Sequence, residues 1–352
     1  MRSIFLLVAV WMGALGLAQT PPPKASDPVQ VGVQLYRLGL YDKALPKFEE
    51  ALKRNPSSPE ALYWLARTQL KLGLLNPALE NAKTLVARNA TYIGGYMALA
   101  EAYVALARAT EDRARAQGYL EMALTALKDG EKVNPKYPPL HAQRGVVYAF
   151  LGQYDKAVES LKLSLVLEDA PEVRSTLAEV YLAQGKADEA LQEYKKALAK
   201  APQDVSLRVR YASLLLLKNQ AEEAAKVLEE AVQMRPGNAE AWYTLGQAYF
   251  ALRRWKEAGV AFEQTIALAP VRYPAAYAYA GRVYMELGEA QKARSRLTVA
   301  VQMEKQNPEY RFYLGLANER LGDKAGARYQ CQEALKLKPG FKEAEDCVNR
   351  NL

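Results

Sequence analysis

The chain has 352 residues, of which 50% are hydrophobic and 24% are charged, and its formal net charge is +8. Its single histidine, His141, excludes a metal site that joins two histidines. The spacing of its two cysteines fits neither a zinc site nor a redox pair. We therefore expect no metal and no cofactor.

Residues 1–18 have the pattern of an export signal. A positive start at Arg2 is followed by an unbroken apolar run of fifteen residues, 4–18, that ends in small residues. This run is shorter than the ~20 residues that cross a bilayer, so we expect cleavage rather than an uncleaved membrane anchor. The residue directly after Ala18 is not a cysteine, which argues against a lipoprotein anchor. Residues 19–24 form a proline-rich spacer. The mature protein is then exported, periplasmic or secreted, and does not span a membrane.

From residue 25 to residue 341 the sequence repeats with a period of about 34 residues. One repeat is clearest at residues 242–270, which read W-x2-L-G-x2-Y, then A-x3-F, then a closing proline. Position 8 of each repeat is small: Gly32, Ala66, Ala100, Gly145, Ala178, Ala212, Gly246, Gly281 and Gly315. Position 20 is always alanine: Ala44, Ala78, Ala123, Ala157, Ala190, Ala224, Ala258, Ala293 and Ala327. Such columns indicate two helices that cross closely, where a leucine would overpack by roughly 1–3 kcal/mol.

Other columns complete a helix–turn–helix unit. Larger apolar residues at position 24 fill the space between neighbouring helix pairs: Phe48, Leu161, Tyr194, Leu228, Phe262 and Leu297. Glycines provide a positive φ in the turn between paired helices: Gly39, Gly73, Gly152, Gly185, Gly288 and Gly322. An irregular helical bundle, the alternative, would not keep such columns in register nine times.

This pattern resembles the tetratricopeptide repeat (TPR) family. The resemblance implies an all-α fold, a right-handed α-solenoid superhelix of helix–turn–helix repeats, closed by a capping helix at residues 342–352. The nine expected repeats are residues 25–58, 59–92, 93–137, 138–170, 171–204, 205–238, 239–273, 274–307 and 308–341. The third contains an 11-residue insertion, close to three helical turns, so we expect one overlong hairpin whose insertion is shared between both helices. Its tip, around Glu111 to Arg115, is either a second docking point or a neutral insertion.

In this family the first helices line a concave groove that binds the ligand. Carried over by repeat position, the candidate binding residues are Tyr63, Trp64, Arg67, Arg210, Tyr243, Phe250, Tyr279, Arg282, Phe312 and Tyr313. Milder residues at such positions include Met97, Glu101, Gln143 and Val146. Aromatic rings beside guanidinium groups are typical of binding hot spots, although each ring could instead pack between adjacent first helices. The lysine–asparagine clamp with which one subfamily holds a C-terminal carboxylate is absent.

The two cysteines, Cys331 and Cys347, both lie near the C-terminus. In an exported protein an even pair predicts a disulfide, and two buried free thiols are the alternative. Position 24 faces the following helix in this family. Cys331 occupies position 24 of the last repeat, and Cys347 lies on the helix that follows it.

These observations indicate a non-catalytic protein–protein interaction scaffold of the cell envelope that holds an extended peptide or a helix. The alternative is an accessory subunit for export or assembly of an envelope polymer, with its groove facing a glycan or a synthase. We expect no enzyme, because catalytic motifs are absent and every repeat is used to build the solenoid. Without Arg2 the net charge is about +7 and is spread thinly, so we expect a protein or peptide partner and no nucleic acid.

Overall fold

The computed structural model describes residues 27–352, and the predicted signal peptide and spacer lie outside these residues. The described residues form nineteen α-helices and no strand, which confirms the all-α fold class. The chain divides into two compact units: unit 1 ends at Lys200, and unit 2 is Ala201–Leu352. None of the described helices is both long enough and apolar enough to cross a membrane.

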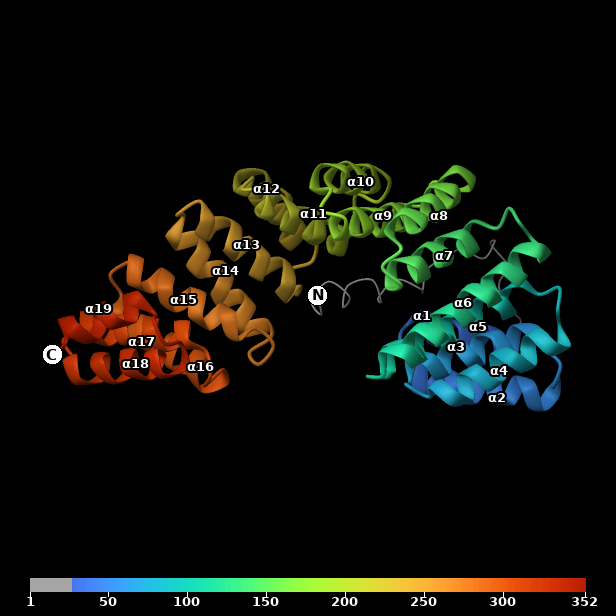
Figure 1. Ribbon diagram of the computed structural model, residues 1–352, viewed down its shortest axis with the longest axis horizontal. Coiled ribbons are helices and arrows are strands. Elements are labelled where there is room, and N and C mark those ends of the chain that lie inside the picture. Colours follow the sequence, from blue (N-terminus) through green and yellow to red (C-terminus); the bar gives the residue numbers. More distant parts are fainter. Residues whose placement is uncertain (1–26) are drawn as a thin grey trace. The chain divides into compact units, whose positions relative to one another are not determined.

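In unit 1, ten consecutive helices form five antiparallel pairs that stack on their neighbours (Figure 1). They are α1 (Pro28–Arg37), α2 (Tyr41–Arg54), α3 (Pro59–Lys71), α4 (Leu75–Arg88), α5 (Ile93–Ala109), α6 (Arg113–Val133), α7 (Pro138–Phe150), α8 (Tyr154–Leu167), α9 (Pro171–Ala183) and α10 (Ala187–Lys200). Several first helices begin at a proline, whose fixed φ suits the first helical position and whose missing N–H costs nothing there. Ser58 caps α3 by accepting the Ala61 N–H at 3.3 Å.

Unit 2 contains four further pairs and a short final helix (Figure 1). They are α11 (Val205–Leu217), α12 (Ala221–Met234), α13 (Ala239–Ala251), α14 (Trp255–Leu268), α15 (Pro274–Glu286), α16 (Ala290–Met303), α17 (Pro308–Arg320), α18 (Lys324–Leu337) and α19 (Lys342–Arg350). The last helix, α19, packs against α18 and α17, so it covers the apolar side of the final pair.

The core of each pair is built on the two columns of small residues. All nine alanines at position 20 are fully buried, from Ala44 to Ala327. A Cβ on Gly246 would lie 2.6 Å from the ring of Phe262, and one on Gly281 would lie 2.5 Å from Leu297. Position 24 therefore packs directly against position 8 of its own repeat, a contact that the sequence reasoning had not assigned to it. This contact explains why position 8 must stay small.

The turns between paired helices contain a residue whose backbone has the left-handed conformation, with a positive φ. All six glycines expected there have φ between 71° and 78°. In two pairs the same turn position carries a residue with a side chain: Asn219 has φ 58° and Arg253 has φ 57°. Asparagine tolerates this conformation, but for arginine it is strained.

The insertion in the third repeat lengthens both helices of its pair. α5 has 17 residues where α3 and α7 have 13, and α6 has 21 where α4 and α8 have 14. The differences of four and seven residues account for the eleven extra residues. Asp112 caps α6 by accepting the N–H groups of Ala114 and Arg115.

Candidate binding sites

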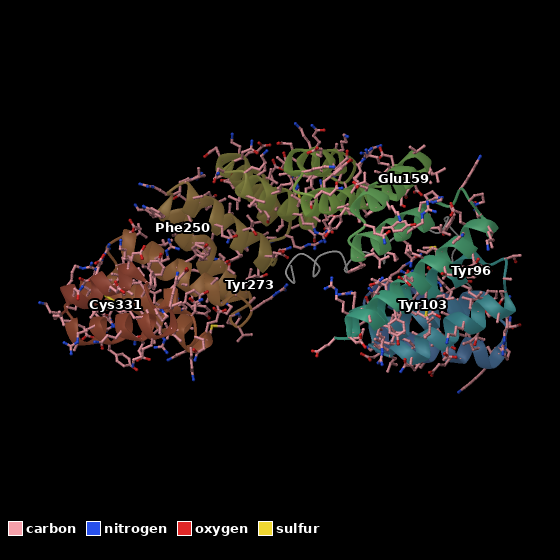
Figure 2. All side chains as sticks on the ribbon, viewed as in Figure 1. Tyr96, Tyr103, Glu159, Phe250, Tyr273 and Cys331 are labelled. Carbon is pink, nitrogen blue, oxygen red and sulfur yellow. A yellow bond between two sulfur atoms is a disulfide. The ribbon has the colours of Figure 1, made fainter. Side chains whose placement is uncertain are left out.

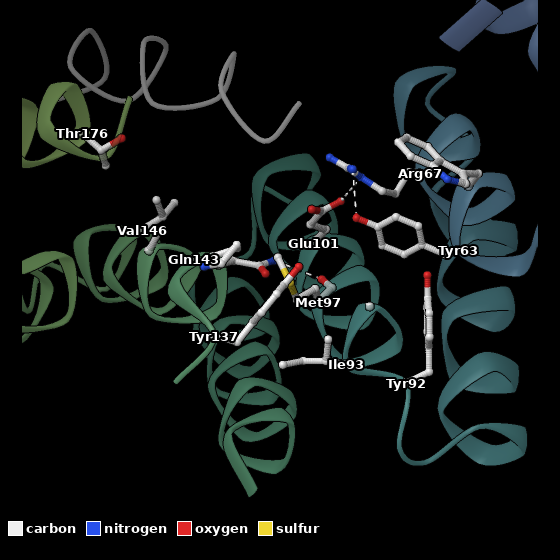
Figure 3. Close-up of a pocket in the computed structure, with 14 residues that line it drawn as sticks. Tyr63, Arg67, Tyr92, Ile93, Met97, Glu101, Tyr137, Gln143, Val146 and Thr176 are labelled. Carbon is white, nitrogen blue, oxygen red and sulfur yellow. Dashed lines mark hydrogen bonds and ion pairs between the residues drawn. The ribbon is translucent and has the colours of Figure 1, made fainter. Parts of the chain in front are cut away.

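A cavity of about 180 Å³ lies in unit 1, and we call it the unit 1 cavity (Figure 3). It is lined mainly from α3, α5 and α7 by Tyr63, Trp64, Arg67, Tyr92, Ile93, Gly94, Met97, Glu101, Tyr137, Pro139, Ala142, Gln143, Val146 and Thr176. The three candidate residues of α3 therefore meet four of the milder residues of α5 and α7 in one place.

One wall of the unit 1 cavity is a buried ion pair between adjacent first helices. The Arg67 Nε donates to a Glu101 carboxylate oxygen at 3.1 Å, and an Arg67 Nη donates to the Tyr63 hydroxyl at 3.0 Å (Figure 3). Burial raises the pKa of the Glu101 carboxyl, although the charge of Arg67 acts in the opposite direction. Burial also raises the pKa of Tyr63 above its usual range. The wall therefore carries two opposite charges that compensate each other.

Aromatic rings surround the Arg67 guanidinium. It lies over the rings of Tyr36, Tyr63 and Trp64, at 5.3 to 5.8 Å from their centroids. Trp64 and Arg67 are only 6% and 8% exposed. The sequence predicted that both face the ligand groove, and in the structure they lie deep in the lining of the unit 1 cavity.

Gln143 reaches the unit 1 cavity from α7. Its Nε2 donates to the Met97 carbonyl at 3.0 Å, which fixes the orientation of the amide. Its Oε1 is buried and has no hydrogen-bond partner among the described residues. A buried acceptor without a partner is costly, so Gln143 offers a free acceptor to any group that enters.

A second candidate surface lies in unit 2, and we call it the arginine–aromatic cluster: Phe250, Tyr279, Arg282 and Tyr313. The Arg282 guanidinium lies 4.7 Å from the ring centroid of Phe250, 4.6 Å from that of Tyr313 and 5.6 Å from that of Tyr279. Among the described residues Arg282 has neither an ion pair nor a hydrogen bond. Three candidate rings are thus brought together around the Arg282 cation, which no described carboxylate neutralises.

The cluster borders a cavity of about 510 Å³, which we call the unit 2 cavity. It is lined by Phe250, Ala251, Arg253, Trp255, Arg282, Met285, Glu286, Tyr313, Leu316 and Arg320. Its charged lining residues are thus three arginines and one glutamate, an excess of positive charge. Figure 2 labels Phe250 on its helix, α13. Arg253 and Trp255 were not among the candidates, and the strained φ of Arg253 was invisible in the sequence.

Aromatic residues that were not among the candidates lie directly before two first helices and before α19, where each contacts a candidate ring. Tyr92 precedes α5 and contacts Tyr63 at 6.1 Å between ring centroids. Tyr273 precedes α15 and stacks on Tyr243 at 5.1 Å. Likewise, Phe341 precedes α19 and contacts Phe312 at 5.1 Å. The family positions cover only helical residues, but the sequence already showed that four repeats end in an aromatic residue: Tyr92, Tyr137, Tyr273 and Phe341.

The remaining candidates have separate surroundings. Tyr243 packs on Phe262 and Tyr279, as expected if some rings stabilise the solenoid rather than the ligand. Arg210 is half-buried on α11 and is not among the residues that line either cavity. The buried His141 contacts the Pro135 carbonyl through Nε2 at 2.7 Å. No group of three potential metal ligands occurs among residues 27–352.

Cys331 and Cys347 form a disulfide that joins α18 to α19, with 6.2 Å between their Cα atoms (Figure 2 labels Cys331). Both residues are fully buried. The pairing links the last repeat to the helix that covers it, and Arg350 adds an ion pair to Glu319 of α17 at 2.9 Å.

Comparison with known proteins identifies the family. Tetratricopeptide repeat family profiles match residues 35–91 and 280–340, and the profile of ChAPs (Chs5p-Arf1p-binding proteins) matches residues 147–273. The solved structure of TTC0263, a thermophilic TPR protein in Thermus thermophilus, is 68% identical to this chain. The match covers 54% of this chain and 97% of that chain, with a TM-score of 0.53. The chain belongs to the tetratricopeptide repeat family.

Curated relatives have lower sequence identity to this chain. A BBSome complex member BBS4 homolog of Drosophila melanogaster is 23% identical over 331 residues, which are 92% of this chain and 60% of the relative. The ancillary SecYEG translocon subunit of Neisseria gonorrhoeae is 38% identical over 104 residues, which are 28% of this chain and 47% of the relative. The chain spans between 23% and 60% of the length of the first three curated relatives that it matches.

Proposed function

We propose that this TPR protein is a non-catalytic interaction scaffold of the cell envelope, which binds an extended, acidic peptide segment through unit 2. The observation that carries the proposal is Arg282, a half-buried guanidinium held by three rings with no carboxylate partner among the described residues. A cation in this setting attracts a carboxylate, and the rings beside it supply apolar contact area at little entropic cost. The excess of arginine in the unit 2 cavity supports an acidic ligand.

Export to the envelope is part of the same proposal. Its support is the apolar run at residues 4–18 and the likeness to an ancillary translocon subunit. Intact-mass measurement of the protein recovered from an envelope fraction tests it, with Gln19 expected as the first residue. A full-length mass from the cytosol would contradict export and leave the peptide-binding proposal standing.

The peptide site is tested with a library of nine-residue peptides of graded acidity, applied to the protein without residues 1–18. We expect acidic peptides with an apolar residue to bind best, and binding to weaken as salt is added. Arg282→Met should reduce the affinity of the selected peptides about tenfold, since a charged hydrogen bond or ion pair is lost.

Arg328→Met is the matched control, because Arg328 is an exposed arginine on α18 that lies outside the unit 2 cavity. Its affinity should equal that of the parent. Equal losses of peptide affinity in both variants would mean that only the net charge of the protein matters. If Arg282→Met loses no affinity, the peptide does not bind at this site in unit 2. A glycan array in parallel tests the alternative role in envelope-polymer assembly, which Arg282-dependent glycan binding would favour.

A further inference from the structure

We propose that the unit 1 cavity is a binding site for one uncharged aromatic ring that carries a hydrogen-bond donor, as in a phenol or an indole. The site is independent of the peptide-binding proposal, because all of its residues belong to unit 1.

The size and depth of the cavity fit a single ring. Its volume of about 180 Å³ exceeds the roughly 150 Å³ of an apolar cavity that holds benzene. Met97, Gln143 and Val146 at its floor are 5% to 8% exposed. The rim, by contrast, is half-buried and aromatic, with Tyr63, Tyr92 and Tyr137 around it. A flat ring can thus enter between tyrosines and stack against them.

The electrostatics exclude a charged ligand. Of the described residues that line the unit 1 cavity, only Arg67 and Glu101 are charged, and they are paired with each other at 3.1 Å. A ligand carboxylate would compete with Glu101 for Arg67, and a ligand ammonium would compete with Arg67 for Glu101. Either would leave one buried charge without its partner, which costs far more than a weak contact returns.

The unpaired Oε1 of Gln143 is the reason why the ligand should carry a hydrogen-bond donor. The Nε2 of Gln143 is committed to the Met97 carbonyl, so its amide cannot turn to donate to a ligand. Its Oε1 remains without a partner among the described residues, and Figure 3 shows the side chain extending from α7 toward Met97 and Glu101. A ring with an O–H or N–H group satisfies this acceptor, whereas a plain hydrocarbon ring leaves it unpaired.

The test compares p-cresol, which has a donor, with toluene, which has the same shape and no donor. Titrations of the protein without residues 1–18 follow the methyl resonance of Met97 by NMR, assigned with Met97→Leu. We expect saturable shifts with both rings and an affinity about tenfold higher for p-cresol, the value of one hydrogen bond to a buried acceptor. Absence of a saturable shift with p-cresol would overturn the proposal.

Gln143→Met keeps the side-chain volume and removes the acceptor, so its preference for p-cresol should fall to about onefold while toluene still binds. Gln184→Met is the matched control. Gln184 also has an unpaired Oε1 and donates its Nε2 to Asp155 at 2.8 Å, but it does not line the cavity. It should retain the tenfold preference. A tenfold preference that survives in Gln143→Met would show that the ring binds elsewhere.

A cavity-filling variant and a competition complete the experiment. Val146→Phe should abolish binding of both rings, with circular dichroism as a check of folding; if it does not fold, the comparison of Gln143→Met with Gln184→Met still decides. Competition with N-acetyltyrosine amide and with a tyrosine-containing pentapeptide distinguishes the two sources of such a ring. Displacement of p-cresol by both assigns the site to a protein side chain. Displacement by the amide alone assigns it to a small free molecule. Displacement by neither would exclude a tyrosine side chain as the source and leave a free phenol of the size of p-cresol.

Discussion

Arg67 and Arg282 occupy the same repeat position, position 9 of a first helix, one in each unit, and their surroundings differ in one decisive residue. Both guanidinium groups lie over aromatic rings. At position 9 of the following repeat, unit 1 offers Glu101 and unit 2 offers Leu316. Arg67 therefore becomes a buried, neutralised part of the scaffold, whereas Arg282 keeps its charge available. In a repeat protein the neighbouring repeat decides whether a side chain serves structure or binding.

The largest effect expected from this difference concerns stability. Arg67→Met should destabilise unit 1 by about 3–5 kcal/mol, because it leaves the buried Glu101 carboxylate without its partner. Arg282→Met should cost less than about 1 kcal/mol, because no described carboxylate depends on it. Amide hydrogen exchange of α3 and α5, compared with that of α13 and α15, measures both changes. Similar losses in the two variants would contradict the distinction between a structural and a binding arginine.

We expect the disulfide to stabilise the C-terminal helices without changing the stability of unit 1. Reduction should destabilise α18 and α19 by about 3 kcal/mol, the value for closing a loop of this length, since the cysteines are 16 residues apart. Contacts in a repeat array run between neighbours, so helices α1 to α10 should keep their exchange protection. The double variant Cys331→Ala with Cys347→Ala lacks the disulfide without any reductant, so it controls for other effects of the reductant. Equal loosening of unit 1 in reduced protein would show long-range cooperativity instead.

The pH dependence of Arg67→Met sharpens the same comparison. A carboxyl whose pKa is higher in the folded than in the unfolded state binds protons more tightly when folded, so it favours folding as the pH falls through the folded pKa. Burial raises the pKa of Glu101, and Arg67 opposes this, so its removal should raise that pKa further. The destabilisation should therefore be smaller at pH 5 than at pH 8, by roughly 1.4 kcal/mol per unit of pKa difference. Urea titrations at the two pH values measure it, and Arg67→Met with Glu101→Gln should lose the dependence.

The sequence predicted the scaffold well because its determinants are local and periodic. The columns at positions 8 and 20 follow from the closest helix crossings, and every member is buried as expected. The candidate binding residues were predicted only in part, because a family position says where a side chain starts and not what covers it. Trp64 is buried by Tyr36 and Phe48 of the preceding pair, and Tyr243 by Tyr273 of the following turn. The 34-residue offset of Arg67 and Glu101 was readable, but their burial required the rings around them.

Leu316→Glu tests whether one residue separates the two kinds of arginine. The new carboxylate, at the position that Glu101 occupies in unit 1, should pair with Arg282 and compete with an acidic peptide. We expect peptide affinity to fall about tenfold, as in Arg282→Met, with the helical signal retained. Leu316→Gln, which has a similar shape without the charge, should bind peptide within about twofold of the parent. Unchanged affinity in Leu316→Glu would show that Arg282 does not contact the peptide.

The smallest effect concerns the strained turn beside the unit 2 cavity. Arg253 has φ 57°, a conformation that costs a residue with a Cβ roughly 1–2 kcal/mol and glycine almost nothing. Arg253→Gly should therefore stabilise the α13–α14 pair by about 0.5–1 kcal/mol, after the greater entropy of glycine in the unfolded chain is subtracted. Asn219→Gly, in the equivalent turn of α11–α12, should change stability by less, because asparagine tolerates φ 58°. Arg253→Ala keeps the strain and removes the charge, so it should lose peptide affinity without gaining stability. If Arg253→Gly gains stability and loses peptide affinity together, the strain is maintained because the charge at this turn serves binding. A stable Arg253→Gly variant with unchanged affinity would instead make the arginine an incidental occupant of a glycine position.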